Sequence, residues 1–140
     1  MNREIKFRAW DKKEKMMCYV SLIDFENSTC VLIYPTKTYK EEDKSFSEVK
    51  LMQYTGLKDK NGKEIYEGDI LKSVTLDGKV HHEPVKFHEG CFCKLTTLPP
   101  NNRKRWSSLR IHLYDDMDIL IAYEVVGNVF ENPELLEELK

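Results

Sequence analysis

Hydrophobic and polar residues alternate along much of the chain, and the first segment to show this pattern is 4–10. Every second residue there is apolar, which is the period of a β-strand with one buried face. The charged segment 11–15 separates it from the apolar run 16–25. Because two such segments joined by a loop of about five residues typically pair, we predict a β-hairpin at the start of the chain.

The next apolar run, Cys30–Tyr34, is rich in β-branched and aromatic residues. It predicts a third strand that ends at Pro35, because proline lacks the N–H that a strand ladder needs. The segment Lys37–Lys50 is charged, and its few apolar residues follow neither a strand nor a helix period. We therefore interpret it as a surface segment that precedes a short apolar run, Leu51–Tyr54.

Three turn signals divide the middle of the chain. Asn61-Gly62 and Asp77-Gly78 are pairs that tolerate the positive φ of tight hairpin turns, and Glu67-Gly68-Asp69 marks another reversal. The residues from Asp69 to Leu76 predict a strand that ends at a hairpin, with one face made of Ile70, Lys72, Val74 and Leu76 and the other of Leu71, Ser73 and Thr75.

Two further strands are predicted over 80–88 and 91–98, where apolar and β-branched residues are frequent. Glu89-Gly90 lies between them and predicts a tight turn, so the two strands form a hairpin. Pro99-Pro100 ends the second strand.

The rest of the chain gives weaker signals until its last strand. We interpret 103–108 as a loop, and the apolar runs 111–114 and 119–122 fit either a strand or a helix. The segment 124–130 alternates again and predicts a strand.

A helix start is predicted at the end of the chain. Asn132 is a residue type that caps helices, Pro133 suits the first helical position, and Glu134 favours the positive end of the helix dipole. A helix of under two turns is marginal alone, so we expect it to dock on a sheet.

These elements predict a mainly β fold of antiparallel strands, with a small SH3-like barrel and a short C-terminal helix. At 140 residues the chain has the usual size of one domain, so we assign 1–140 to a single domain. The charged segment offers one subdivision, into an N-terminal hairpin region over 1–50 and a barrel with the helix over 51–140.

Composition narrows the functional classes. The net charge of −2 gives no overall positive field for nucleic acid, so such binding needs a local patch. No apolar run reaches the roughly 20 residues of a membrane span, and the start lacks the apolar core of a signal peptide. We expect no membrane contact, a cytoplasmic location, and thiols rather than disulfides at the cysteines.

The richest cluster of metal-ligand residue types contains His88, Cys91 and Cys93, with His81 and His82 nearby. In a strand, the two cysteines would face the same side and place two thiolates near one ion. The spacing matches no common structural zinc pattern, however, and buried cysteines usually act as small hydrophobes. We therefore treat these residues as weak metal candidates and predict no cofactor.

The candidate nucleic-acid surface is a basic and aromatic cluster, made of Arg103, Lys104, Arg105 and Trp106. The cations would contact phosphates and the indole ring would stack on a base. Basic loops are also common on proteins that bind no nucleic acid. Acidic residues elsewhere on such a protein can pair with the loop and neutralise its charge.

Catalytic motifs are absent from the sequence. It contains no Gly-x-Ser-x-Gly elbow, no phosphate-binding loop and no dinucleotide fingerprint. We predict that the protein is not an enzyme and assign no catalytic residue.

Four blocks of sequence resemble the YopX family of bacteriophage and prophage proteins. They are Phe7-Arg8-Ala9-Trp10-Asp11, Gln53-Tyr54-Thr55-Gly56-Leu57, the segment Asp59 to Asp69, and Val126-Gly127-Asn128-Val129-Phe130-Glu131-Asn132-Pro133. The resemblance implies a small, mainly β protein from a phage or prophage, with no catalytic residues that can be carried over. Glycines, Trp10 and the Asn-Pro pair in these blocks suit turns, packing and a helix start, so the blocks specify a shape.

Together these observations favour a non-catalytic protein-interaction or oligomerisation module in the cytoplasm of the host bacterium. Its partner would be another protein or a second copy of the chain. The alternative is a nucleic-acid-binding protein that uses the basic and aromatic cluster.

Overall fold

The computed structural model describes residues 4–98, 103–109 and 119–139. These residues form two compact units, Met1–Tyr54 and Thr55–Lys140 by chain position. Strand β5 (Val49–Asp59) continues from the first unit into the second. No helix in the described part of the chain is long and apolar enough to span a bilayer.

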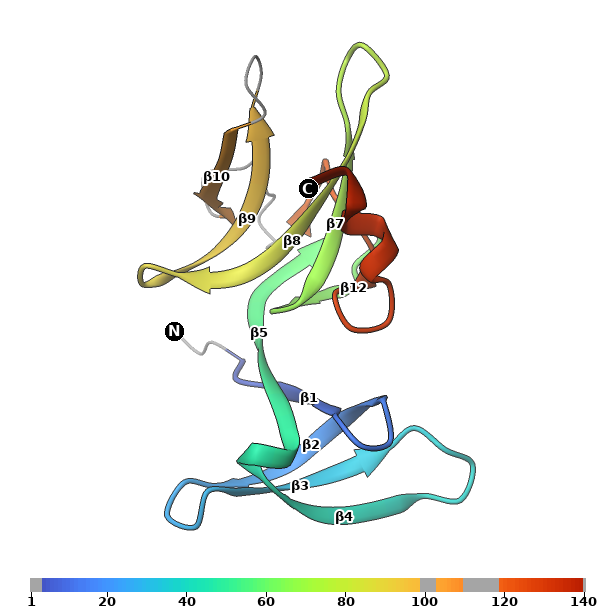
Figure 1. Ribbon diagram of the computed structural model, residues 1–140, viewed down its shortest axis with the longest axis vertical. Helices are drawn as coiled ribbons and strands as arrows, with labels where there is room; N and C mark the ends of the chain where they lie inside the picture. Colours follow the sequence, from blue (N-terminus) through green and yellow to red (C-terminus); the bar gives the residue numbers. More distant parts are fainter. Residues whose placement is uncertain (1–3, 99–102, 110–118, 140) are drawn as a thin grey trace. The chain divides into compact units, whose positions relative to one another are not determined.

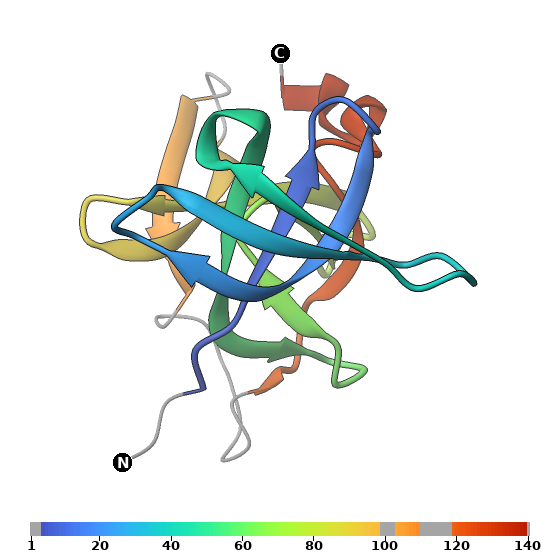
Figure 2. The same cartoon turned by 90° about the horizontal axis from the view of Figure 1, so that it is seen from below.

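The first unit is an antiparallel sheet in the order β5-β1-β2-β3-β4 (Figures 1 and 2). Its other strands are β1 (Phe7–Asp11), β2 (Met16–Asp24), β3 (Thr29–Tyr34) and β4 (Lys40–Ser45). The β1–β2 pair confirms the predicted N-terminal hairpin, and β3 confirms the predicted third strand. Side chains from one face of this sheet form its core: Ala9, Cys18, Cys30, Leu32, Tyr34 and Val49. A capped 3-10 turn, η1 (Phe46–Glu48), leads from β4 into β5.

Strand β4 corrects the interpretation of Lys37–Lys50 as a surface segment without regular structure. Residues 40–45 pair with β3 along their whole length. Lys40 and Lys44 lie on either side of Glu42, with Nζ to Oε distances of 3.3 Å each. Charged side chains are typical of an edge strand, because they discourage pairing with other chains.

The β1–β2 turn is organised by Asp11, which is almost completely buried. Its Oδ1 accepts hydrogen bonds from the backbone N–H groups of Lys13 and Glu14, at 2.9 and 3.1 Å. The Tyr34 hydroxyl donates to Oδ2. Burial alone would raise the pKa of Asp11, but these hydrogen bonds favour the carboxylate and leave the pKa below its usual value. Asp11 therefore holds a turn.

The second unit contains an antiparallel sheet in the order β10-β9-β8-β7-β12. Its strands are β7 (Asp69–Val74), β8 (Val80–His88), β9 (Cys91–Leu98), β10 (Arg103–Ser108) and β12 (Glu124–Asn128). The C-terminal half of β5 pairs with β6 (Glu64–Tyr66) and, in parallel, with β11 (Ile119–Leu120). The core of this unit is Leu57, Ile65, Leu71, Val85, Leu109, Leu120 and Val125.

The mainly β, antiparallel class is confirmed, but the predicted SH3-like barrel is wrong, because the sheet that the described residues form does not close. Strands β10 and β12 are the two ends of the sheet and not neighbours (Figure 1). Sequence periodicity predicts single strands and local hairpins, whereas closure depends on pairing between strands that are distant in sequence.

The interpretation of 103–108 as a loop is also wrong. These residues form β10 and pair with β9 from Arg103 opposite Leu98 to Ser108 opposite Cys93. Three consecutive basic residues are unusual in the interior of a sheet, but β10 lies at one end of its sheet and all three are exposed.

The chain ends in a 3-10 helix, η3 (Pro133–Leu139), and not in the predicted α-helix. Residues of η3 do lie beside β8. Asn132 does not cap it as predicted, since its Oδ1 accepts from the backbone N–H of Asn128 at 3.2 Å. A Cβ at Gly127 would lie 2.4 Å from this same oxygen, so a side chain there would push Asn132 out of its position. The Asn-Pro block thus closes a turn against β12.

Candidate functional site

Three side chains meet on one face of the second unit's sheet, and a fourth lies on the same face. Trp106 on β10 stacks on the His88 ring with a centroid distance of 5.5 Å and an interplanar angle of 27°. The Nζ atom of Lys86 lies 5.4 Å from the Trp106 ring centroid. Lys104 shares this face because it stands two residues from Trp106 on the same strand. We call Lys86, His88, Lys104 and Trp106 the β8–β10 patch.

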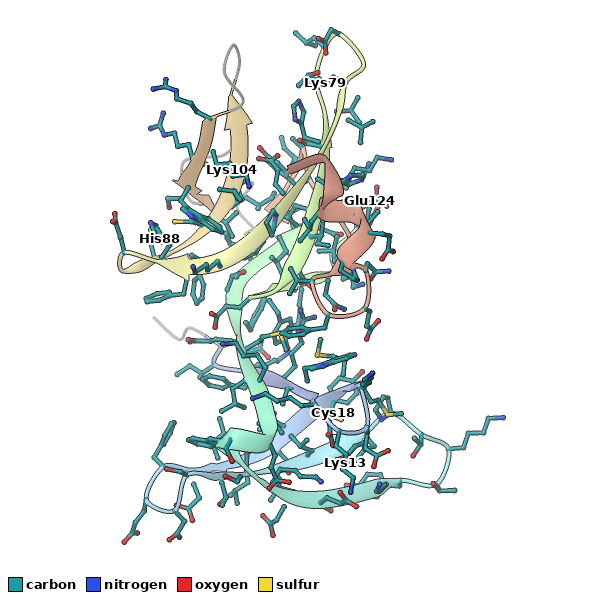
Figure 3. The ribbon with its side chains drawn as sticks, viewed as in Figure 1. Lys13, Cys18, Lys79, His88, Lys104 and Glu124 are labelled. Carbon is teal, nitrogen blue, oxygen red and sulfur yellow. The ribbon has the colours of Figure 1, made fainter. Side chains whose placement is uncertain are left out.

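Strand alternation divides the basic cluster that the sequence offered. Arg103 and Arg105 are exposed, but they point to the opposite face from Lys104 and Trp106. Figure 3 shows Lys104 on β10 and His88 near the β8–β9 turn. The structure therefore replaces a linear cluster with a face that is built from two strands.

Electrostatics favour an anionic ligand at the β8–β10 patch. Lys86 and Lys104 are exposed, while the Trp106 and His88 rings are half-buried. One acid beside the patch is Glu89, whose Oε1 lies 3.8 Å from Nε2 of His88 and whose side chain is 85% exposed. Such an exposed carboxylate neutralises only part of the local positive charge, because water screens it.

Sequence reasoning missed Lys86 because it is eighteen residues before Lys104 and separated from Trp106 by β9. One signal was present, since alternation along the predicted strand 80–88 places Lys86 and His88 on the same face. The missing step was the pairing of β10 with β9, which a loop at 103–108 does not permit.

The metal candidates form a pair of thiols and not a three-ligand site. The Sγ atoms of Cys91 and Cys93 lie 3.3 Å apart, and both approach the backbone oxygen of His88, at 3.6 and 3.7 Å. The His88 ring stacks on Trp106. Within 4–98, 103–109 and 119–139, no three His, Cys, Asp or Glu side chains gather to hold a metal ion.

A buried ion pair lies on the other face of the same strands. Lys94 donates to Oε2 of Glu83, and each side chain is 4% exposed. Thr96 donates to the same oxygen at 2.6 Å, and Ser73 donates to Oε1 at 3.1 Å. The Nζ atom of Lys94 also lies 5.2 Å from the Tyr123 ring centroid.

This buried group is best explained by structure. Both oxygens of Glu83 are occupied by donors from the protein, which is how a buried charge becomes tolerable. Burial, and then the charge of Glu83, raise the pKa of Tyr123 to about 12, so its hydroxyl stays protonated at neutral pH. The group fixes β7, β8 and β9 to one another.

The blocks that carry the family resemblance hold turns. Asp59 accepts three backbone hydrogen bonds, from Asn61, Lys63 and Val125, each at 2.9 Å. Asp69 accepts from the backbone N–H of Tyr66 at 2.8 Å. These acidic residues are buried and serve the backbone.

Comparisons with known proteins agree with this geometry. The family model described as YopX protein matches residues 6–137, which is nearly the whole chain. The chain belongs to the YopX protein family. The comparison with curated proteins gave no match.

Two solved structures resemble the chain along almost its full length. Protein EF1440 from Enterococcus faecalis is 31% identical, with a TM-score of 0.61 over 97% of this chain and 100% of that one. Protein yopX from Bacillus subtilis is 25% identical, with a TM-score of 0.58 over 94% of this chain and 98% of that one. The names of these two proteins state no activity, so the function of this YopX-family chain depends on its own residues.

Proposed function

We propose that this YopX-family protein is a non-catalytic binding module, and that the β8–β10 patch binds single-stranded nucleic acid in the cytoplasm of a phage-carrying bacterium. The observation that carries the proposal is the Trp106–His88 stack with the exposed Lys86 beside Trp106, and with the exposed Lys104 two residues further along the same face. The sequence alone favours protein interaction over nucleic-acid binding. The order is reversed here because only the fold brings Lys86 and His88 to Trp106.

Single-stranded nucleic acid is the polyanion that this chemistry suits. Lysine ammonium groups contact phosphates, and an aromatic ring stacks on any base because every base has a π-face. A net charge of −2 leaves little long-range attraction, so affinity has to come from the local contacts of the patch.

The first test changes the lysines of the patch. We expect Lys86→Gln/Lys104→Gln to lower the slope of log affinity against log salt concentration by about 1.4, since each phosphate contact on a single strand contributes about 0.7. Fluorescence anisotropy with a labelled oligonucleotide of about 16 nucleotides measures this slope. Trp106→Leu should weaken binding about 5- to 150-fold, which corresponds to one stacked base.

The matched control is Arg103→Gln/Arg105→Gln, which removes the same charge from the same strand on the opposite face. It should change the slope by less than half as much as the lysine pair. Glu89→Gln should strengthen binding, because it removes the acid beside His88. Equal losses in the arginine and lysine variants, or no detectable binding at low salt, would reject the patch.

Protein interaction is the second candidate, and the β7–β8 hairpin favours it. Leu76 at the tip is 111% exposed, and Val74 and Val80 beside it are also exposed. Figure 1 shows this hairpin extending beyond the other strands of its sheet, and Figure 3 labels Lys79 at its tip. These three apolar side chains lie beside the charged Asp77 and Lys79, and such a surface suits pairing with its own copy in a second chain.

The tip is held rigid by hydrogen bonds. The backbone N–H of Thr75 donates to Lys79, and that of Gly78 donates to Thr75, both at 2.9 Å. The Lys79 N–H also donates to Oδ1 of Asp77 at 3.1 Å. A turn that is fixed in this way loses little entropy on contact.

Light scattering after size-exclusion chromatography tests self-association over a range of concentrations. The tip is small, so we expect a weak dimer with an interface below about 800 Å². Leu76→Ser should shift the protein to monomer, whereas Leu22→Ser, an exposed leucine on β2, should not. A protein that stays monomeric at every concentration contradicts this candidate.

A further inference from the structure

The Cys91–Cys93 pair combines proximity with unequal exposure. Its sulfur atoms are 3.3 Å apart, because alternation places residues two apart on one face of β9. Cys91 is partly exposed, whereas Cys93 is 4% exposed. An oxidant from solvent therefore meets Cys91 first, with a second thiol already in contact.

The β8–β9 turn fixes the place of this pair. Glu89 and Gly90 have φ angles of 47° and 85°, which are the two positive values of a tight hairpin turn. Cys91 follows directly and lies opposite His88, and Cys93 lies opposite Lys86 on one side and Ser108 on the other. The two thiols consequently lie on the same face as the β8–β10 patch, between its two strands.

We propose that Cys91 and Cys93 are a reversible oxidation site, which a peroxide converts into a disulfide within β9. The Cys91 thiolate attacks one peroxide oxygen, which gives a sulfenic acid and releases hydroxide, or an alkoxide from an organic peroxide. The Cys93 thiol then gives up its proton as its sulfur attacks the Cys91 sulfur, the S–S bond forms, and the leaving hydroxide takes up that proton and becomes water. The dithiol loses two electrons and the peroxide gains them.

Strand geometry makes this disulfide easy to reduce again. Two residues of a strand span about 6.7 Å between Cα atoms, which is at the upper end of the roughly 4.4–6.8 Å that disulfides allow. Closing the bond therefore shortens and bends β9. Strained and accessible disulfides have the more oxidising potentials that characterise labile, regulatory bonds.

A bend in β9 would also disturb the nucleic-acid surface, a consequence that rests on the proposed function. Cys91 pairs with His88, and Cys93 pairs with Lys86, so both strand partners belong to the patch. Oxidation should move these two residues relative to Trp106 and weaken binding. Reduction should restore it.

The test treats the full chain with hydrogen peroxide and then alkylates it under denaturing conditions. We expect the mass to fall by about 2 Da before alkylation, from two lost hydrogens, and two of the four thiols then to escape alkylation, with full recovery after dithiothreitol. The peptide that contains both cysteines should carry the link. Buried Cys18 and Cys30 are internal controls that stay alkylatable.

Two variants separate a disulfide from general oxidation. Cys93→Ser should leave Cys91 oxidised without a link, and Cys91→Ser should keep its three remaining thiols alkylatable. Four alkylatable thiols in the wild-type protein, or sulfinic acids without a link, would overturn the site. Mass spectrometry detects the disulfide whether or not nucleic acid binds. A protein that forms the disulfide but binds the oligonucleotide with unchanged anisotropy would therefore contradict only the coupling between oxidation and binding.

Discussion

Replacing Lys94 with methionine is expected to destabilise the second unit by about 3–5 kcal/mol, because Glu83 would remain as an unpaired buried charge. The wild-type pair is 4% exposed on each side, so water cannot replace the lost ammonium group. Urea unfolding measures the change. Trp106 is the only tryptophan in a Trp10→Phe background, so its fluorescence reports on the second unit.

A double variant shows whether the loss of stability comes from the unpaired carboxylate of Glu83. Glu83→Leu/Lys94→Met should recover at least half of the lost stability, since replacing a whole buried pair with apolar residues is often neutral. Lys104→Met removes an exposed lysine from the same sheet and should cost less than about 0.5 kcal/mol. A Lys94→Met protein within about 1 kcal/mol of wild type would contradict the role of the pair.

Local hairpins were predictable from sequence because their signals lie within a few residues. The strands β7, β8 and β9 are joined by turns at Asp77-Gly78 and Glu89-Gly90, and both glycines have the positive φ that such turns require. Alternation between turns then places each side chain on one face or the other.

The edge strands β4 and β10 were not predictable in the same way. Both are rich in charged residues, which is the composition of a surface loop as well as of an edge strand. Their structure depends on hydrogen bonds to β3 and β9, and the sequence of either segment carries little apolar signal for that pairing. The open sheet has the same origin, since pairing between distant strands decides closure.

The candidate site shows what this difference means for function. A loop over 103–108 presents Arg103, Lys104, Arg105 and Trp106 as one cluster, whereas a strand divides them between two faces. Only the strand brings Lys86 within reach of Trp106. The residue types were therefore visible in the sequence, but their grouping required the register of β9 and β10.

The family blocks have a physical explanation that needs no ligand. Asp11, Asp59 and Asp69 are each 1% exposed and accept backbone hydrogen bonds within turns. Backbone N–H groups that are buried in turns need acceptors, and a short carboxylate supplies two oxygens at once. Asp59 differs from the other two because it also reaches Val125, sixty-six residues later.

Asp59→Ala is expected to destabilise the second unit by about 3–5 kcal/mol. The substitution removes three hydrogen bonds to a charged acceptor and leaves buried donors unpaired. Each such bond contributes about 1.5–3 kcal/mol, and bonds to one side chain do not add in full. Urea unfolding in the Trp10→Phe background measures the cost. A midpoint close to that of the wild type would show that Asp59 does not join β5 to β12.

Asp59→Asn separates the turn from the long-range contact. Its single amide oxygen can accept from Asn61 and Lys63, as Oδ1 of the aspartate does, but its NH₂ group then faces the N–H of Val125. Amide hydrogen exchange should therefore keep protection at Asn61 in this variant and lose it at Val125, whereas Asp59→Ala should lose both. Retained protection at Val125 in both variants would show that the hydrogen bond to Asp59 does not hold β12 in place.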